Sequence, residues 1–359
     1  MTRVLTVVGA RPQFIKAAPL SVALRRRGIE EVLVHTGQHY DQAMSARFFA
    51  ELDLPPPAVN LGVGSASQAA QTGAMLAALE PVMVEARPDC VVVFGDTNST
   101  LAGALAAAKL NLPVAHVEAG LRSYNRRMPE EINRIVADSV ATLLFAPTAA
   151  AAAILKGEGH PDERIVVCGD VMYDACLAFA ARARTASDVL DRLALAEGGF
   201  VLSTIHRAET TGDPRRLAAV LGGLGAIGER LPVILPLHPR TAGALAEHRV
   251  PTPPGVRLID PVGYLDMARL TMAARLVATD SGGLQKEAFF HRVPCVTLRT
   301  ETEWSELVRS GWNRLAPPDD PDAIAETIIA ALAAPLPGDA PPYYGKGDAA
   351  GIIAGRLVG

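Results

Sequence analysis

Short apolar runs recur along the chain, and longer segments with helical patterning separate them. In the first half the runs lie at residues 4–8, 32–34, 91–94, 114–117, 143–146 and 165–167. In the second half they lie at residues 200–204, 233–235, 256–259, 276–278 and 295–298. Runs that are apolar at every position predict strands buried on both faces, and such strands alternating with helices predict parallel α/β sheets.

The two sets of runs predict two domains, because 359 residues exceed what one core of usual size accommodates. A helical stretch rich in Ala and Arg separates them between residues 169 and 199. We expect two Rossmann-like, doubly wound parallel-sheet domains facing a cleft, at residues 1–170 and 171–348. A last helix at 349–359 can pack back on the first domain. Ligands of such sheets bind beyond the carboxyl ends of the strands.

One pattern occurs once in each half: a buried strand, a polar turn, a helix, and a next strand led by proline. The first turn contains Gly95-Asp96-Thr97, and the second contains Asp280-Ser281-Gly282-Gly283. A helix that begins on such a turn presents free N–H groups and the positive end of its dipole. Phosphates and carboxylates bind at such helix ends, so the sequence predicts an anion site in each domain.

Carboxylates gather at the carboxyl edge of the first predicted sheet. Asp96 ends an entirely apolar run, Glu118 ends the next strand, and Glu130 and Glu131 follow Pro129. Asp96 could simply cap a helix, and the glutamates could compensate a helix dipole. Their clustering favours acid/base chemistry instead, because neighbouring carboxylates raise one another's pKa towards values useful in proton transfer.

Cations and one further acid suggest an anionic ligand with a sugar attached. Arg11 and Lys16 lie near a helix start, where a cation gains nothing from the dipole. His206 and Arg207 follow the first strand of the second domain, where they could hold a diphosphate, or His206 could be purely structural. Glu287, one turn beyond the paired glycines, can accept hydrogen bonds from the vicinal hydroxyls of a ribose. Stray charge on a solvated helix explains Arg11 and Lys16 equally well.

Composition and motif content exclude several classes of protein. The formal charge of -4 gives no basic field for a nucleic-acid backbone. The apolar stretches are too short for a membrane span or a signal peptide, so we expect a cytoplasmic protein. The four cysteines form no C-x-x-C pair, which favours reduced core residues over ligands or disulfides.

Metal and dinucleotide sites lack their usual sequence signals. His35 and His39 have a spacing of four, but they fall where a strand runs into a loop, so we expect no metal site. No G-x-G-x-x-G occurs at a strand-to-helix turn, which argues against a dinucleotide cofactor.

Seven motifs follow one another along nearly the whole chain: Gly9-Ala10-Arg11-Pro12, His35-Thr36-Gly37-Gln38-His39, Gly95-Asp96-Thr97, His116-Val117-Glu118-Ala119-Gly120-Leu121-Arg122, Pro129-Glu130-Glu131-Ile132-Asn133-Arg134, His206-Arg207 and Thr279-Asp280-Ser281-Gly282-Gly283. Together they resemble the non-hydrolysing UDP-N-acetylglucosamine 2-epimerase family. Residues 169–172 and 285–290 look more like the branch that acts on 2,3-diacetamido-uronic acid sugar nucleotides.

The resemblance implies a glycosyltransferase-B type fold, a homodimer, a UDP-amino sugar as substrate, and no required cofactor or metal. It also implies inversion at C2 by elimination and re-addition of UDP, since the C2 hydrogen is not acidic and a dinucleotide fingerprint is lacking. The implied acid/base groups are Asp96, Glu118 and Glu130, with His206 stabilising the departing diphosphate. The implied ligands of the UDP-sugar are Arg11, Lys16, Arg134, His206, Ser281, Gly282, Gly283 and Glu287.

Three alternatives stay open from the sequence: a hydrolysing 2-epimerase, a glycosyltransferase of the same fold, and a non-enzymatic UDP-sugar-binding protein. One departure from the family pattern predicts simpler kinetics. Some bacterial members place an arginine after the Gln-Thr-Gly segment to bind a second, activating sugar nucleotide, whereas here Gln71-Thr72-Gly73 is followed by Ala74.

Overall fold

The computed structural model describes residues 2–38, 49, 51–338 and 341–357. The chain forms two compact units. Unit 1 contains the residues up to Ala178 together with those from Pro342 onward, and unit 2 contains Phe179–Pro341. His39, half of the histidine pair considered above, lies outside the described residues.

Unit 1 is built on a parallel sheet whose described strands follow the order β3-β2-β1-β4-β5-β6-β7. The strands are β1 (Arg3–Val8), β2 (Glu30–His35), β3 (Val59–Asn60), β4 (Cys90–Phe94), β5 (Val114–Val117), β6 (Leu143–Ala146) and β7 (Ile165–Val167). All five residues of β4 are buried, as expected for a strand covered on both faces.

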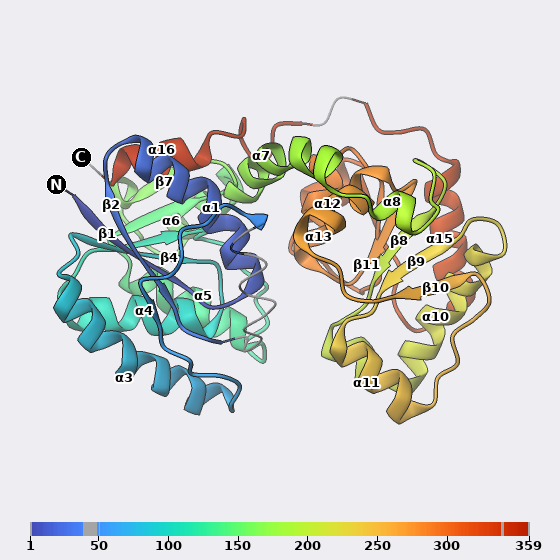
Figure 1. Cartoon of the computed structure of the whole chain (residues 1–359), viewed down its shortest axis with the longest axis horizontal. Coiled ribbons are helices and arrows are strands. Elements are labelled where there is room, and N and C mark those ends of the chain that lie inside the picture. Colours follow the sequence, from blue (N-terminus) through green and yellow to red (C-terminus); the bar gives the residue numbers. More distant parts are fainter. Residues whose placement is uncertain (1, 39–48, 50, 339–340, 358–359) are drawn as a thin grey trace. The chain divides into compact units, whose positions relative to one another are not determined.

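Helices cover both faces of this sheet (Figure 1). They are α1 (Arg11–Arg26), α3 (Gln68–Ala86), α4 (Asn98–Lys109), α5 (Pro129–Val140), α6 (Ala149–Gly157), the short 3-10 turn η1 (Asp162–Arg164) and α16 (Ala349–Arg356). The last helix, red in Figure 1, packs beside α1, and Asp174 accepts hydrogen bonds from the first two N–H groups of α16. The C-terminal segment is therefore part of unit 1.

Unit 2 repeats the plan with a parallel sheet in the order β10-β9-β8-β11-β12-β13. Its strands are β8 (Val201–Thr204), β9 (Val233–Pro236), β10 (Val256–Ile259), β11 (Leu276–Thr279), β12 (Cys295–Thr297) and β13 (Asn313–Leu315). Its helices are α8 (Val189–Arg192), α9 (Ala208–Thr211), α10 (Pro214–Gly228), α11 (Pro239–His248), α12 (Tyr264–Ala273), α13 (Gly282–Phe290), α14 (Ser305–Arg309) and α15 (Pro321–Ala333). Helix α7 (Val171–Ala186) crosses from unit 1 into unit 2.

The two doubly wound parallel sheets expected from the sequence are confirmed. In each sheet the strand order reverses beside the first strand, between β1 and β4 in unit 1 and between β8 and β11 in unit 2. The two similar turns of the sequence follow β4 and β11, so they occupy the same topological position in the two sheets. Ligands of open α/β sheets bind at such switch points.

All four cysteines are buried and free, as the sequence predicts. Burial raises the pKa of the Cys90 and Cys295 thiols to about 12, which keeps both protonated. Among the described residues, no helix is both long and apolar enough to cross a membrane.

Candidate active site

The turn after β4 leaves the Asp96 carboxylate available for a ligand. Thr97, not Asp96, caps α4, because its hydroxyl accepts a hydrogen bond from the Thr100 N–H at 3.3 Å. The Asp96 side chain is 34% exposed and forms an ion pair with Arg134 at 2.5 Å. Asn133 Nδ2 donates to the Asp96 carbonyl at 2.9 Å. The capping role that the sequence allowed for Asp96 therefore belongs to its neighbour.

Glu118 follows β5 and lies against the same turn. Its φ of +72° is in the left-handed region, which is uncommon for a residue other than glycine. Its carboxylate forms a short ion pair with Lys16 of α1, and both side chains are almost fully buried. A Cβ on Gly95 would lie 3.1 Å from Glu118 Oε2 and 3.4 Å from Lys16 Nζ. The fold thus brings Glu118 next to the residue that precedes Asp96.

The two carboxylates each have a cation as partner, which differs from the mutual repulsion expected from their clustering. Arg134 pairs with Asp96 and Lys16 pairs with Glu118. Burial opposes the charge on Arg134, but Asp96 and Glu131 outweigh it and raise the pKa of this guanidinium. Lys16 and Arg134, both expected to hold UDP, neutralise acid/base candidates in this structure.

Of the two adjacent glutamates on α5, Glu131 is the one that organises the site. Its carboxylate accepts hydrogen bonds from Ser123 N (2.9 Å), Ser123 Oγ (3.0 Å) and Tyr124 N (2.9 Å), and from Arg134 Nη1 (3.0 Å). Burial raises the pKa of Glu131, but these donors lower it by more. Glu130 is exposed, and no hydrogen bond or ion pair joins its carboxylate to another described residue.

A second buried network, which was not predicted from the sequence, connects β5 with α5. His116 lies between Asp138 (Nδ1 to Oδ1, 2.6 Å) and the Gly95 carbonyl (Nε2 to O, 2.8 Å). Arg122 Nη2 lies 2.7 Å from the other Asp138 oxygen. The spacing of Glu131, Arg134 and Asp138 places all three on one face of α5, and this pattern could have identified Asp138.

At the end of β1, Gln13 rather than Arg11 holds the switch point together. Gln13 Oε1 accepts from the Gly9 and Ala10 N–H groups, and its Nε2 donates to the Phe94 carbonyl at 3.0 Å. A Cβ on Gly9 would lie 2.1 Å from both Ser99 Oγ and Thr36 Oγ1, so this close approach requires glycine. Arg11 is half-buried at the first position of α1.

In unit 2, Asp280 anchors the loop that carries His206. The fully buried Asp280 carboxylate accepts from the N–H groups of His206 (2.9 Å) and Arg207 (2.9 Å). His206 Nδ1 lies 3.2 Å from the same carboxylate. Burial lowers the pKa of His206, and Arg207 and Arg240 lower it further against the opposing charge of Asp280. The imidazole is therefore neutral at neutral pH.

The start of α13 is open to a ligand. Ser281 Oγ caps the helix by accepting from Leu284 N. A Cβ on Gly282 or Gly283 would meet only atoms at ordinary contact distances of 3.7–3.9 Å, so internal packing does not require either glycine. One turn later, Glu287 is 8% exposed, and burial raises its pKa to about 7 against the weaker opposing charge of Lys286.

A charged cluster beside Gly282 was also not predicted from the sequence. Arg299 donates two hydrogen bonds to Glu303, at 2.9 and 3.1 Å, and Arg207 lies 3.6 Å from the same carboxylate. Burial raises the pKa of Glu303, but Arg299 and Arg207 bring it down to about 2. Next to it, Trp304 Nε1 donates to the Gly282 carbonyl, and the Lys286 ammonium lies 4.2 Å from the centre of the Trp304 ring.

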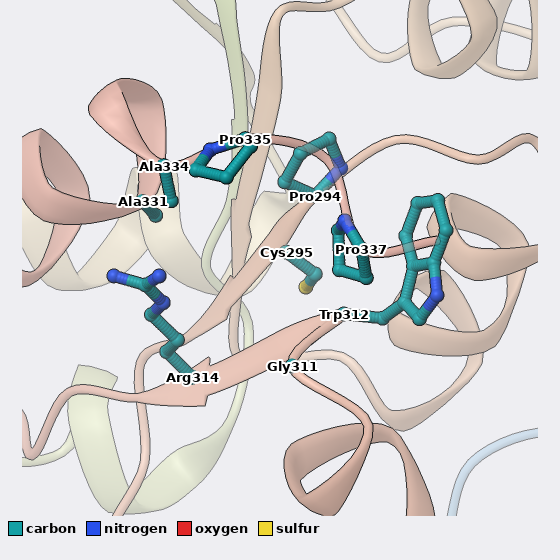
Figure 2. Close-up of a pocket in the computed structure, with 9 residues that line it drawn as sticks. All are labelled: Pro294, Cys295, Gly311, Trp312, Arg314, Ala331, Ala334, Pro335 and Pro337. Atoms are coloured by element: carbon teal, nitrogen blue, oxygen red, sulfur yellow. The ribbon is translucent and has the colours of Figure 1, made fainter. Parts of the chain in front are cut away.

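A small pocket in unit 2 lies apart from these residues (Figure 2). Its lining combines three prolines with Trp312, Arg314, Cys295, a glycine and two alanines. It offers neither a carboxylate nor an imidazole, so we do not assign it to the active site. Among the described residues, no group of three or more His, Cys, Asp or Glu side chains could hold a metal ion.

Comparison with known proteins agrees with this architecture. The family model described as UDP-N-acetylglucosamine 2-epimerase matches residues 22–357. A Pseudomonas aeruginosa UDP-2,3-diacetamido-2,3-dideoxy-D-glucuronate 2-epimerase is 48% identical, over 99% of each chain. A Methanocaldococcus jannaschii UDP-N-acetylglucosamine 2-epimerase is 42% identical, over 86% of this chain and 87% of its own.

Solved structures agree as well. The crystal structure of M. jannaschii UDP-GlcNAc 2-epimerase in complex with UDP-GlcNAc and UDP superposes with a TM-score of 0.92. It is 39% identical in sequence and covers 100% of this chain and 99% of its own. The Neisseria meningitidis UDP-GlcNAc 2-epimerase bound to UDP-GlcNAc gives a TM-score of 0.90 at 28% identity, over 99% and 100% of the two chains.

Two doubly wound parallel units, each with its polar side chains at the switch point, define a two-domain α/β protein of the glycosyltransferase-B type. The family match and the full-length relatives narrow this class. The chain belongs to the UDP-N-acetylglucosamine 2-epimerase family.

Proposed function

We propose that this protein is a non-hydrolysing epimerase that inverts C2 of a UDP-2-acetamido sugar. The observation that carries the proposal is the pair of carboxylates at the switch point of unit 1, Asp96 and Glu118, on turns that contact each other. The family relationship supplies the reaction, and UDP-2,3-diacetamido-2,3-dideoxy-D-glucuronate is the favoured substrate because that relative is similar at 48% over the full length.

The proposed chemistry needs one group to take a proton and another to return it. A carboxylate removes the C2 proton while the C1–O bond to UDP breaks, which leaves a C1=C2 double bond. UDP then adds back to C1 as a proton is delivered to the other face of C2. Asp96 and Glu118 are the acid/base groups, with Glu130 as a third candidate from the family resemblance. The partners Lys16 and Arg134 keep the site close to neutral, and both could turn towards the diphosphate with Arg11.

Unit 2 is the proposed holder of UDP. The α13 N-terminus, with Ser281 and two glycines that internal packing does not require, suits a phosphate. Neutral His206 can donate a hydrogen bond to the leaving diphosphate through Nε2, in the tautomer that carries its proton there. The Glu287 carboxylate makes no hydrogen bond with another described residue, so it is available to the ribose hydroxyls. The proposal also includes, from the family resemblance, a cytoplasmic homodimer that needs no cofactor.

The products formed distinguish this reading from its alternatives. Incubated with UDP-GlcNAc or its 2,3-diacetamido-uronic acid relative, the protein should convert one of them to the C2 epimer with UDP still attached, as seen by NMR. Release of the free sugar and UDP would favour a hydrolysing 2-epimerase. Tight binding of both nucleotides without any turnover would favour a binding protein.

A further inference from the structure

The buried pair of His116 and Asp138 lies between the two turns that carry the acid/base candidates. His116 is fully buried on β5, and Asp138 is fully buried on α5. Nε2 of His116 meets the carbonyl of Gly95, the residue before Asp96. Asp138 Oδ2 accepts from the N–H of Gly120, two residues after Glu118, at 3.1 Å. One ion pair therefore contacts the backbone of both turns.

The hydrogen-bond pattern defines where the protons are. A carbonyl can only accept, so His116 Nε2 carries a proton and donates it to Gly95. Asp138 Oδ2 already accepts from Gly120 N and faces the Arg122 guanidinium at 2.7 Å, as an ionised carboxylate does. Asp138 Oδ1 then accepts from Nδ1 of His116, which makes the imidazole doubly protonated.

Electrostatics agrees with this assignment. Burial disfavours the imidazolium, but the charge and hydrogen bond of Asp138, the Gly95 carbonyl and the charge of Glu118 together raise the pKa of His116. The pKa of Asp138 is correspondingly lowered, against its own burial, by His116 and Arg122. The charged groups around the pair are balanced, because Arg122 also binds Glu158 and Lys16 binds Glu118.

The backbone conformation of the two turns explains why a clamp between them, the His116–Asp138 pair, is needed. Gly95 has φ of +64°, Glu118 of +72° and Gly120 of +80°, so both turns hold left-handed residues. Glu118, which is not glycine, holds this conformation only if its surroundings over-determine it. The contacts of His116 to Gly95 and of Asp138 to Gly120 hold the two turns in this conformation from inside unit 1.

We propose that His116 and Asp138 are positioning residues. They hold the turns that carry Asp96 and Glu118 in fixed positions relative to each other, as proton transfer at C2 requires. This inference rests on the proposed function, in which Asp96 and Glu118 act on the substrate. Neither His116 nor Asp138 is itself a proton donor to the sugar, because both are fully buried and their polar atoms are engaged.

The test compares variants that keep different halves of the clamp, using deuterium exchange at C2 of the UDP-sugar in D2O. In His116→Gln the amide can still donate to the Gly95 carbonyl, whereas in His116→Asn it can reach only Asp138. His116→Ala and Asp138→Asn should lower kcat at least about 100-fold, with KM and the affinity for UDP changed less than about threefold. His116→Gln should recover about tenfold in kcat over His116→Ala, and His116→Asn should recover less.

A matched core variant separates positioning from general damage. Leu24 is fully buried at the end of α1 remote from the switch point, so Leu24→Ala should lower Tm with kcat per folded molecule near that of the wild type. If kcat falls in proportion to Tm in Leu24→Ala and in the His116 variants alike, the proposal is wrong. A His116→Ala variant with kcat within about threefold of wild type would also overturn it.

A measurement on the wild type keeps the proposal testable if the variants do not fold. The imidazole nitrogen resonances of His116 should show two protonated nitrogens between pH 6 and 8, and a single-proton imidazole would contradict the clamp. If the wild-type protein exchanges no C2 proton in any UDP-2-acetamido sugar, the proposed function fails; the nitrogen resonances still decide whether the ion pair exists.

Discussion

At the scale of single residues, the candidate acid/base groups are two carboxylates that pair with cations at the switch point of unit 1. Thr97 caps α4 and Glu131 organises the loop at 123–124, so neither of these tasks falls to Asp96 or Glu118. Both of those carboxylates face cations that a diphosphate could also attract. The proposed acid/base groups are therefore carboxylates that neither cap α4 nor hold that loop.

Removing either carboxylate should separate chemistry from binding. Asp96→Asn and Glu118→Gln each lose a proton acceptor, and general acid/base groups contribute about 100- to 10,000-fold in rate. We expect C2 deuterium exchange to fall by at least about 100-fold, with UDP affinity, measured by calorimetry, within about threefold. Glu80→Gln, at an exposed glutamate of α3, is the matched control. Equal losses of exchange and UDP affinity would contradict the assigned roles.

Glu287 predicts a pH dependence of nucleotide binding. Its pKa of about 7 means that it is mostly protonated below neutrality, whereas ribose hydroxyls need an acceptor. Binding must then expel the proton, so affinity for UDP-GlcNAc should weaken as pH falls below 7. Protonation of His206 would act in the opposite direction, but its lowered pKa places that effect at more acid pH.

The measurement for this prediction is a calorimetric titration with UDP-GlcNAc between pH 6 and 8. Glu287→Gln should bind more weakly at pH 8 and lose most of the pH dependence, while Glu301→Gln, at an exposed site of unit 2, should behave as wild type. A Glu287→Gln variant with an unchanged pH dependence would show that another group titrates.

The sequence predicts which residues lie at the carboxyl edges, but not what those residues contact there. Asp96, Glu118, His206 and Ser281 all follow central strands, so period and polarity suffice to place them. Lys16, which the resemblance implies as a ligand of UDP, pairs with Glu118, and this contact across 102 positions depends on how α1 packs. Such contacts arise from tertiary packing, which local pattern does not encode.

At the scale of elements, α5 is the scaffold of the unit 1 site. Its Asn133 and Arg134 hold Asp96, its Glu131 holds the loop at 123–124, and its Asp138 contacts His116 and Gly120. All the apolar runs identified in the sequence became strands. The strands β3 and β13 were not predicted, because they are two and three residues long and lie at sheet edges, where few residues are buried.

The contact between the loop after β5 and α6 predicts a steric effect at Gly120. A Cβ there would lie 2.4 Å from the Ala151 carbonyl oxygen and 2.8 Å from Leu155 Cγ, at φ of +80°. Gly120→Ala should lower the free energy of unfolding by on the order of 2–4 kcal/mol in a urea titration.

Gly28→Ala is the control for backbone strain, because φ is +68° there and no atom of the described residues lies within 4 Å of the added Cβ. Gly28→Ala should lower the free energy of unfolding less than Gly120→Ala does, by on the order of 1 kcal/mol or more. Equal effects of the two substitutions would mean that the loop and α6 separate freely.

At the scale of the whole molecule, the two sheets share one topology but present different functional residues at their switch points. The turns after β4 and β11 are topological equivalents, yet the first presents Asp96 and the second presents Ser281 with two glycines. This division fits a protein in which one unit performs proton transfer and the other holds the nucleotide.

The exposed Ala74 on α3 predicts simple saturation kinetics. No arginine follows Gly73 to bind a second sugar nucleotide, so rate should depend hyperbolically on UDP-sugar concentration. Steady-state rates over a wide substrate range test this. A sigmoidal curve that added UDP-GlcNAc makes hyperbolic would refute it.

Incorporation of solvent deuterium at C2 tests the central claim most directly. The protein is incubated in D2O with UDP-GlcNAc and, separately, with UDP-2,3-diacetamido-2,3-dideoxy-D-glucuronate, and the nucleotide sugars are recovered for NMR and mass spectrometry. The account predicts deuterium at C2 in both epimers of at least one substrate, with UDP attached. Epimers formed without deuterium, or no exchange with either substrate, would contradict it.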